Sequence, residues 1–149
     1  MAELWSGLTG ALHSLWDSVS PSKVEQVIIR EVQMNPPGAR TFVRLAGISG
    51  AIAVSLGAYG SHVFRHKEVD PRLKETFEIA NKYHFLHSLA LLAVPQTPRP
   101  VLTGTLLSSG IILFCGSCYY HAMTGNNTVR KVTPYGGFLL IFAWLSVAL

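Results

Sequence analysis

Charged residues are scarce in this sequence. Asp, Glu, Lys and Arg make up 13% of its 149 residues and hydrophobic residues 49%, whereas soluble domains carry roughly 25% charged residues. The scarcity is greatest in residues 101–120, which carry no formal charge. A helix of that length rises about 30 Å, the thickness of a hydrocarbon core. The sequence therefore indicates a membrane protein, and the buried helix of a soluble protein is the alternative.

Motifs for catalysis and cofactor binding are also missing. The sequence contains no P-loop, no Rossmann glycine pattern and no nucleophile elbow. Its net charge of +4 comes from residues in short loops between apolar runs, without the basic patch that nucleic-acid binding uses. We therefore expect a protein that is not an enzyme, has no cofactor and does not bind nucleic acid.

Cysteine is rare as well. The two cysteines, Cys115 and Cys118, form a C-x-x-C motif inside an apolar run. A thioredoxin-like dithiol needs a helix N-terminus and a polar approach, and one pair makes neither a disulfide framework nor a zinc site. We expect both side chains to be small packing residues.

Four helices are expected to cross the membrane. Asp70-Pro71 and Thr133-Pro134 each place a capping residue before a proline, which is a typical helix start. The four predicted spans cover residues 41–64, 71–94, 101–120 and 134–149. An even number of crossings places both ends of this membrane domain, residues 41–149, on one side.

The first 40 residues form a separate N-terminal extension. Leucines recur at steps of three and four over residues 1–20, with Trp5 and Trp16 beside them. This spacing predicts an amphipathic helix on the membrane surface or against a partner helix. Residues 23–34 are expected to be extended or poorly helical, and the Asn-Pro-Pro-Gly stretch at 35–38 marks the boundary.

Small residues recur about every four positions along the first span. Helices in lipid pack closely where their side chains are small, so this face is expected to contact a neighbouring helix; a homodimer contact is the rival use. The helix-packing residues are Ser49, Gly50, Ala53, Gly57, Gly60 and Ser61.

Four histidines are predicted to converge near one end of the bundle: His62, His84, His87 and His121. One hypothesis is a metal or haem site, or a proton relay with Tyr83 and Tyr120. The other, which we favour, is hydrogen bonding between helices, because no carboxylate or thiolate is spaced to support bound metal. We expect no metal site, and we expect interhelical polar contacts from His62, His87, Tyr83 and Tyr120.

Four separated blocks of the sequence, residues 44–62, 77–92, 114–125 and 133–146, resemble the transmembrane protein 256 family, whose bacterial relatives carry a domain of unknown function. His62, His87, Pro134, Gly136 and Gly137 fall on its motifs. The resemblance implies a small multi-pass membrane protein without an established activity, and it suggests the mitochondrial inner membrane. Cys118 departs from the family pattern, which weakens a redox role.

The sequence thus predicts an all-α protein, an integral membrane four-helix bundle with an N-terminal amphipathic interfacial helix. The expected function is that of a non-enzymatic scaffold or accessory subunit. Its expected partners are the lipid bilayer and other membrane proteins or further copies of the chain. The first alternative is a small transporter or a proton or ion conduit that uses the histidines. The second alternative is a redox component that binds haem or metal.

Overall fold

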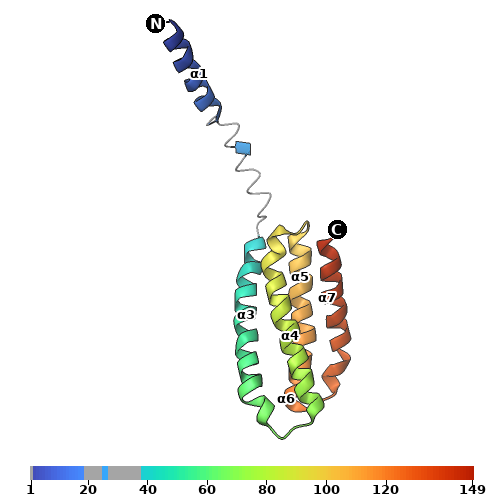
Figure 1. The fold of residues 1–149 in the computed structure, drawn as a ribbon. Helices are drawn as coiled ribbons and strands as arrows, with labels where there is room; N and C mark the ends of the chain where they lie inside the picture. The colour runs from blue at the N-terminus through green and yellow to red at the C-terminus, as the bar shows by residue number, and fades with distance from the viewer. Residues whose placement is uncertain (1, 19–24, 27–37) are drawn as a thin grey trace. The chain divides into compact units, whose positions relative to one another are not determined.

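The computed structural model describes residues 2–18, 25–26 and 38–149, and the chain divides into two compact units, Met1–Pro36 and Pro37–Leu149. All regular structure in the described ranges is helical (Figure 1), which confirms the all-α class. The predictions of an extended or poorly helical segment at 23–34 and of a stop at 35–38 fall almost entirely outside the described residues.

The first unit contains helix α1 (Ala2–Ser18), which confirms the helix predicted over residues 1–20. Leu8, Leu12 and Trp16 are exposed on it. His13 Nδ1 and Asp17 Oδ2, one helical turn apart, lie 3.4 Å from each other. The apolar side of α1 is therefore available to a membrane surface, and that placement stays a prediction.

The second unit is built from long helical rods. Because the π-helical segment η3 begins directly after α5 and ends directly before α6, these three segments form one continuous rod. The remaining rods are α3, α4 and α7, and short 3₁₀ turns connect them. The helix bounds are α3 Ala39–His62, α4 Pro71–Ala93, α5 Pro100–Gly110, η3 Ile111–Cys115, α6 Gly116–Thr124 and α7 Thr133–Val147.

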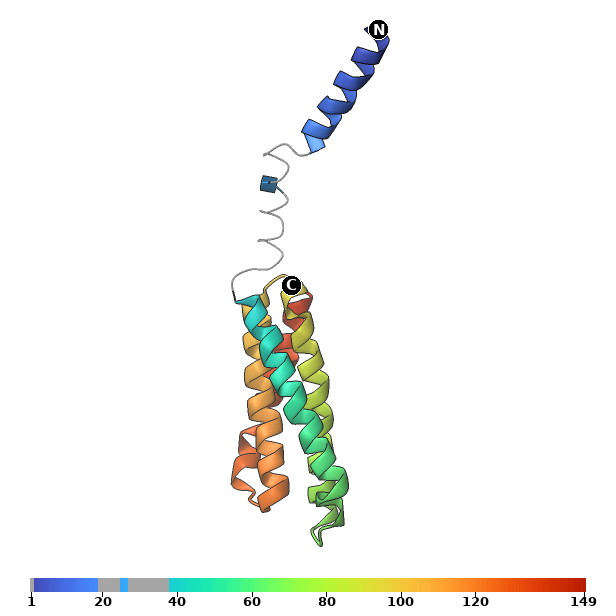
Figure 2. The same cartoon turned by 90° about the vertical axis from the view of Figure 1, so that its left-hand side faces the viewer.

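The rods of the second unit alternate in direction. Figures 1 and 2 show the start of α3 and the C-terminal end of α7 at one end of this unit, here called the terminus end. The connections at residues 63–70 and 125–132 lie at the other end, here called the loop end. Helix α3 packs against α4, α4 against α6, and α5 against α7.

Two predicted helix starts have different outcomes. Asp70 caps α4 as expected, because its carboxylate Oδ1 accepts a hydrogen bond from the Arg72 backbone N–H at 2.9 Å. The expectation that Thr133 caps the last helix is wrong: Val132 is the N-cap residue and no side chain caps the helix. The Thr133 hydroxyl lies 2.7 Å from Ser117 Oγ on α6 instead, so it joins two helices.

The core is aromatic at the loop end and contains a hydroxyl pair between α5 and α7. Phe77 is 2% exposed, and its ring lies 4.8 Å from that of Phe64 and 5.0 Å from that of Tyr119, between centroids. Between α5 and α7, the buried hydroxyls of Thr103 and Ser146 lie 2.8 Å apart. A hydrogen bond between helices satisfies polar groups that neither water nor lipid reaches.

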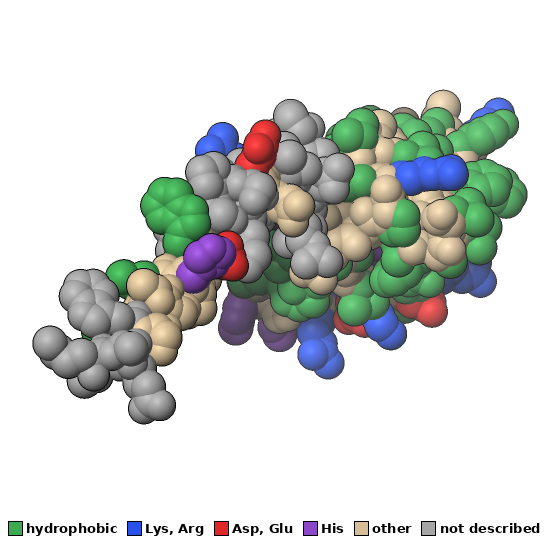
Figure 3. Space-filling view, turned by 90° about the horizontal axis from the view of Figure 1, so that it is seen from above, with side chains coloured by type: hydrophobic (Ala, Val, Ile, Leu, Met, Phe, Trp, Pro, Cys, Tyr) green, Lys and Arg blue, Asp and Glu red, His purple; other side chains and the backbone are tan. Residues whose placement is uncertain are grey.

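Large apolar side chains are exposed along the outer sides of these helices, and Figure 3 shows hydrophobic atoms over much of the visible face. Two helical segments of the described chain are long and apolar enough to cross a membrane, Arg40–His66 and Pro100–Thr124. Helix α4 carries charges in its first turns, and the 15 residues of α7 rise about 22 Å. Two of the four predicted spans therefore meet this test of length and composition.

Candidate functional site

Helix α4 presents a row of polar side chains toward its neighbours. Asn81, His84 and Ser88 are spaced by three and four residues, so they share one face of the helix. His84 and Ser88 are buried and Asn81 is half-buried. Buried polar groups need partners, and those of this row lie on α3 and α6.

His84 lies beside a pair of hydroxyls that joins α4 to α3. Ser88 Oγ donates its single proton to the His84 carbonyl oxygen at 2.7 Å. Ser49 Oγ, 2.6 Å from Ser88 Oγ, must therefore donate to it, and Ser49 Oγ accepts from His84 Nε2 at 3.1 Å. His84 Nδ1 is buried without a hydrogen-bond partner in the described part of the chain. This order of donors places a proton on Nε2, and Nδ1 has no acceptor for a second proton, so the ring is assigned as neutral.

Asn81 connects three helices. Its side-chain Nδ2 donates to the Ala53 carbonyl oxygen on α3 at 2.7 Å and to the Tyr119 hydroxyl on α6 at 3.1 Å. The Tyr119 ring in turn packs edge-on against His84, with 6.0 Å between the centroids. Asn81 and His84 therefore belong to one continuous set of contacts in the bundle interior.

His87 lies on another side of α4 and contacts α7. Its Nδ1 is 2.7 Å from the Tyr83 carbonyl oxygen, and the Trp144 indole N–H donates to its Nε2 at 3.2 Å. An indole N–H only donates, so Nε2 is the acceptor and Nδ1 carries the proton. Both nitrogens of a neutral His87 are thus occupied, and the side chain connects two helices.

The His87–Trp144 pair lies in a groove between α4 and α7. The groove has a volume of about 640 Å³, and Phe114 of η3 also lines it. Apolar side chains of both helices form most of its walls, including Leu89 and Ile141, which are about half exposed. This groove is larger than the cavity of about 180 Å³ at the loop end of α3 and α4.

The predicted convergence of four histidines is wrong. His62 is exposed at the end of α3, and His121 Nδ1 lies 3.0 Å from the Asn126 carbonyl oxygen near the loop end. His84 and His87 point to different neighbours. Within the described residues, no three His, Cys, Asp or Glu side chains form a group that could hold a metal ion. The histidines lie apart because they occupy different faces of three helices. Their positions in the sequence indicate a similar depth along the helices but not the face on which each side chain lies.

The small-residue face of α3 meets α4 along part of its length. Ala53 is 1% exposed, and a Cβ built on Gly57 would lie 3.0 Å from Asn81 Oδ1. A Cβ on Gly60 would lie 2.7 Å from Phe77 Cε1, so only glycine fits this contact without a shift. Gly50 has open space beside it, and exposed Ser61 donates to its own helix at the Gly57 carbonyl oxygen.

Tyr83 and Tyr120 lie at the helix surface. The Tyr83 ring stacks on His87 with 5.7 Å between centroids and lies 5.1 Å from Phe114, so it contacts a second helix through its ring. Tyr120 is 48% exposed. Tyr83 thus belongs to the wall of the groove, and Tyr120 faces outward.

The two cysteines of the C-x-x-C motif, Cys115 and Cys118, are buried free thiols.

Comparison with known proteins identifies the family. A family described as "Protein of unknown function (DUF423)" matches residues 56–137. A UPF0382 membrane protein of Schizosaccharomyces pombe is 33% identical over 115 residues, which cover 72% of this chain and 98% of the relative. The chain belongs to the DUF423 family. This confirms the predicted kinship with a bacterial membrane family of unknown function.

Bacterial DUF423 relatives carry the same description. A UPF0382 membrane protein of Bacillus subtilis is 30% identical over 72% of this chain and 93% of its own length. One of Haemophilus influenzae is 30% identical over 72% of this chain and 90% of its own. No solved structure matches the chain. The relatives are membrane proteins by name, which supports an integral membrane location here.

The DUF423 match contains most of the polar network. Asn81, His84, His87 and Tyr119 lie inside residues 56–137, whereas Trp144 lies beyond them. Asn81 and Trp144 have no place among the site residues predicted from the sequence, although the spacing of Asn81, His84 and Ser88 marks one helix face. The Trp144 contact depends on how α7 is rotated, and no local pattern in the sequence reports that rotation.

Proposed function

We propose that this chain is a four-span integral membrane protein that acts as a scaffold or accessory subunit, packs against other membrane proteins or lipids, and catalyses no reaction. The observation that carries the proposal is the outward apolar surface of the second unit, with its groove between α4 and α7. In water an exposed apolar surface of this kind would promote aggregation. In a bilayer it is the surface that meets lipid tails and partner helices.

The alternating rods support four crossings. Four crossings, by α3, α4, the α5–α6 rod and α7, bring the chain back to the side of the membrane on which α3 begins. The start of α3 and the end of α7 both lie at the terminus end, which agrees with this number of crossings. The charges of α4 are concentrated toward the loop end, where Lys82 can extend its amine to the headgroups. The short α7 spans a locally thinned bilayer.

The interior polar groups support a structural role. Asn81, His84 and His87 each connect α4 to another helix by the bonds given above. Hydrogen bonds of this kind hold helices together in lipid. The conduit and haem hypotheses depend on a gathered histidine cluster, and the described histidines lie apart.

The cellular placement extends the proposal. The chain is an animal-type member of the family, of the transmembrane protein 256 kind, in the mitochondrial inner membrane. Basic residues near the loop end support an orientation with that end in the matrix, by the positive-inside rule: Arg65, Lys74, Arg130 and Lys131. Helix α1 lies on the membrane surface through its leucine side.

Filling the groove tests partner packing. Ile141 lines the groove and is 54% exposed, so Ile141→Trp puts bulk into the recess without disturbing the core. We expect the fraction of the chain that co-migrates with a larger complex on native gels to fall several-fold. Ile112→Trp is the matched control, because Ile112 is 70% exposed and lies outside the groove. Equal co-migration of both variants and the parent, or a parent that migrates alone, contradicts partner packing at the groove.

A further inference from the structure

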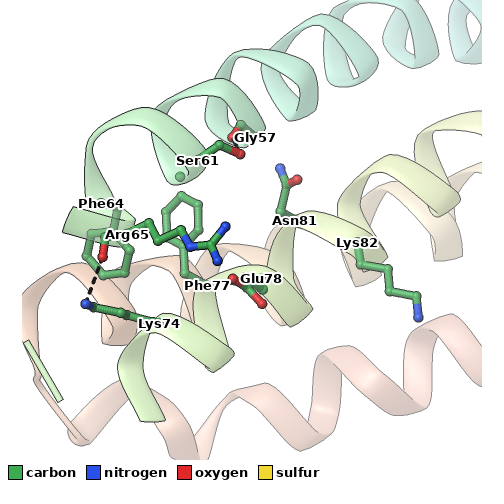
Figure 4. A pocket seen from close by; sticks show the side chains of 10 residues that line it. Gly57, Ser61, Phe64, Arg65, Lys74, Phe77, Glu78, Asn81 and Lys82 are labelled. Atoms are coloured by element: carbon green, nitrogen blue, oxygen red, sulfur yellow. Dashed lines mark hydrogen bonds between the residues drawn. The ribbon is translucent and has the colours of Figure 1, made fainter. Parts of the chain in front are cut away.

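A second cavity lies between the loop end of α3 and the first turns of α4. Its volume is about 180 Å³, more than ten times the roughly 10–15 Å³ that a cavity needs to hold one water. Figure 4 shows Arg65 reaching over this cavity from the 3₁₀ turn η1 (Phe64–His66), which follows α3, with Asn81 and Glu78 on the α4 side. Phe77 and the glycines of α3 form its inner wall.

Cations dominate the lining of this cavity. Arg65, Lys74 and Lys82 face a single carboxylate, that of Glu78. Within residues 38–149, no Lys, Arg or His nitrogen lies within 4.0 Å of a carboxylate oxygen. The lining therefore keeps an excess of positive charge, since Glu78 can offset only one of its three cations.

The lining is also rich in donors that remain available. Lys74 Nζ donates to the Arg65 carbonyl oxygen at 2.8 Å, which joins the two rims of the cavity and leaves the other Lys74 protons unused. Arg65 and Lys82 are exposed residues. A planar guanidinium beside ammonium groups matches an anion with several oxygens, such as a phosphate group.

The position of the cavity indicates where that phosphate comes from. The cavity lies where the apolar stretch of α3 gives way to Arg65, His66 and Lys67, the level at which a spanning helix meets the headgroups. Ile79 and Val54, on the outer surfaces of α4 and α3, are exposed apolar side chains along which acyl chains can lie. Basic pockets between spanning helices bind anionic headgroups.

We infer that the cavity between α3 and α4 binds the phosphate group of an anionic phospholipid through Arg65 and Lys82, with Lys74 fixing the rim. The inference rests on the membrane placement proposed above and deepens it by naming a lipid class. It is independent of partner packing at the α4–α7 groove, which lies on other residues of α4.

Lipid retention by the full chain tests this inference. The chain is reconstituted into nanodiscs of phosphatidylcholine mixed with phosphatidylglycerol, gently extracted, and the retained lipid is weighed by native mass spectrometry. We expect phosphatidylglycerol to be enriched over phosphatidylcholine on the parent chain. The double variant Arg65→Gln/Lys82→Gln should lower that enrichment about tenfold.

The control variant Arg72→Gln/Lys131→Gln removes the same charge from the loop end outside the cavity and should leave the enrichment within about twofold. Equal losses in both variants would show diffuse attraction and overturn the site, as would an unchanged enrichment in both. A parallel titration with inorganic phosphate separates the sources. If inorganic phosphate binds in an Arg65- and Lys82-dependent way while the parent chain shows no preference for phosphatidylglycerol, the ligand is free phosphate and the lipid assignment is overturned.

Two failures remain distinguishable. A chain that stays in solution without detergent overturns the membrane placement, and the lipid assignment with it. A chain that enters the bilayer but retains phosphatidylglycerol no better than phosphatidylcholine overturns only the cavity assignment. In that case the four-span arrangement and the groove are unaffected.

Discussion

Gly136→Ala is expected to destabilise the bundle by about 3 kcal/mol, the upper part of the range for overpacked sites. Gly136 is buried on α7, and a Cβ at this position would overlap the Phe114 backbone nitrogen and lie 2.8 Å from the Leu113 carbonyl carbon. Both atoms belong to the backbone of η3, which cannot turn aside as a side chain can. The extra methyl therefore pushes α7 away from the α5–α6 rod.

The neighbouring glycine provides the matched control. A Cβ on Gly137 would lie 3.8 Å from Phe114 Cδ2, an ordinary contact. Replacing either glycine by alanine gains the same helix propensity, about 1 kcal/mol. The difference in stability between the two variants therefore reports the contact of residue 136 with the η3 backbone. Thermal unfolding of both variants in one detergent should show a much lower midpoint for Gly136→Ala. Equal midpoints would contradict the close approach of α7 and η3.

Asn81→Leu should cost about 1–2 kcal/mol, the range that model peptides give for hydrogen bonds between helices in membranes. The substitution removes the bonds from Asn81 Nδ2 to the Ala53 carbonyl oxygen and to the Tyr119 hydroxyl. It leaves the Tyr119 hydroxyl in the interior without this donor, and an unpaired buried polar group raises the cost. Leu has as many side-chain heavy atoms as Asn and branches at the same Cγ, so packing loss contributes little.

Ser55→Ala is the control for Asn81→Leu. The exposed Ser55 hydroxyl donates to the Ala51 carbonyl oxygen of its own helix at 2.9 Å. Its loss removes a hydrogen bond without separating two helices, so the unfolding midpoint should stay close to that of the parent chain. If both variants unfold like the parent chain, Asn81 does not hold α3, α4 and α6 together.

The helices follow from local chemistry. Asp70 and Pro71 begin α4 as predicted, and Gly125 ends α6 in the left-handed conformation with φ 71°, a common helix end. The predicted bounds of the last helix, 134–149, differ by two residues or fewer from the observed Thr133–Val147. Each of these helix starts and ends is determined by residues adjacent in the chain, so it can be predicted from the sequence alone.

The polar contacts depend on how the helices are rotated, and local patterns do not carry that information. His87 meets Trp144 because α7 approaches η3 at Gly136, and His84 meets Ser49 because α3 packs on α4 at Ala53. The π-helical segment η3 also rotates the faces of α6 relative to those of α5. A regular α-helical spacing carried from α5 into α6 therefore assigns the α6 side chains to the wrong face. Histidines of similar predicted depth consequently point in different directions.

The side of the membrane on which each end of the bundle lies tests the four-span account most directly. Single cysteines are placed at Arg40, Glu68 and Ala148, all exposed, in a chain whose buried Cys115 and Cys118 are replaced by alanine. A thiol reagent that cannot cross membranes is then added to sealed vesicles of one orientation. With four crossings, Arg40→Cys and Ala148→Cys react from the same side and Glu68→Cys from the opposite side. Reaction of Arg40→Cys and Ala148→Cys from opposite sides would contradict four crossings.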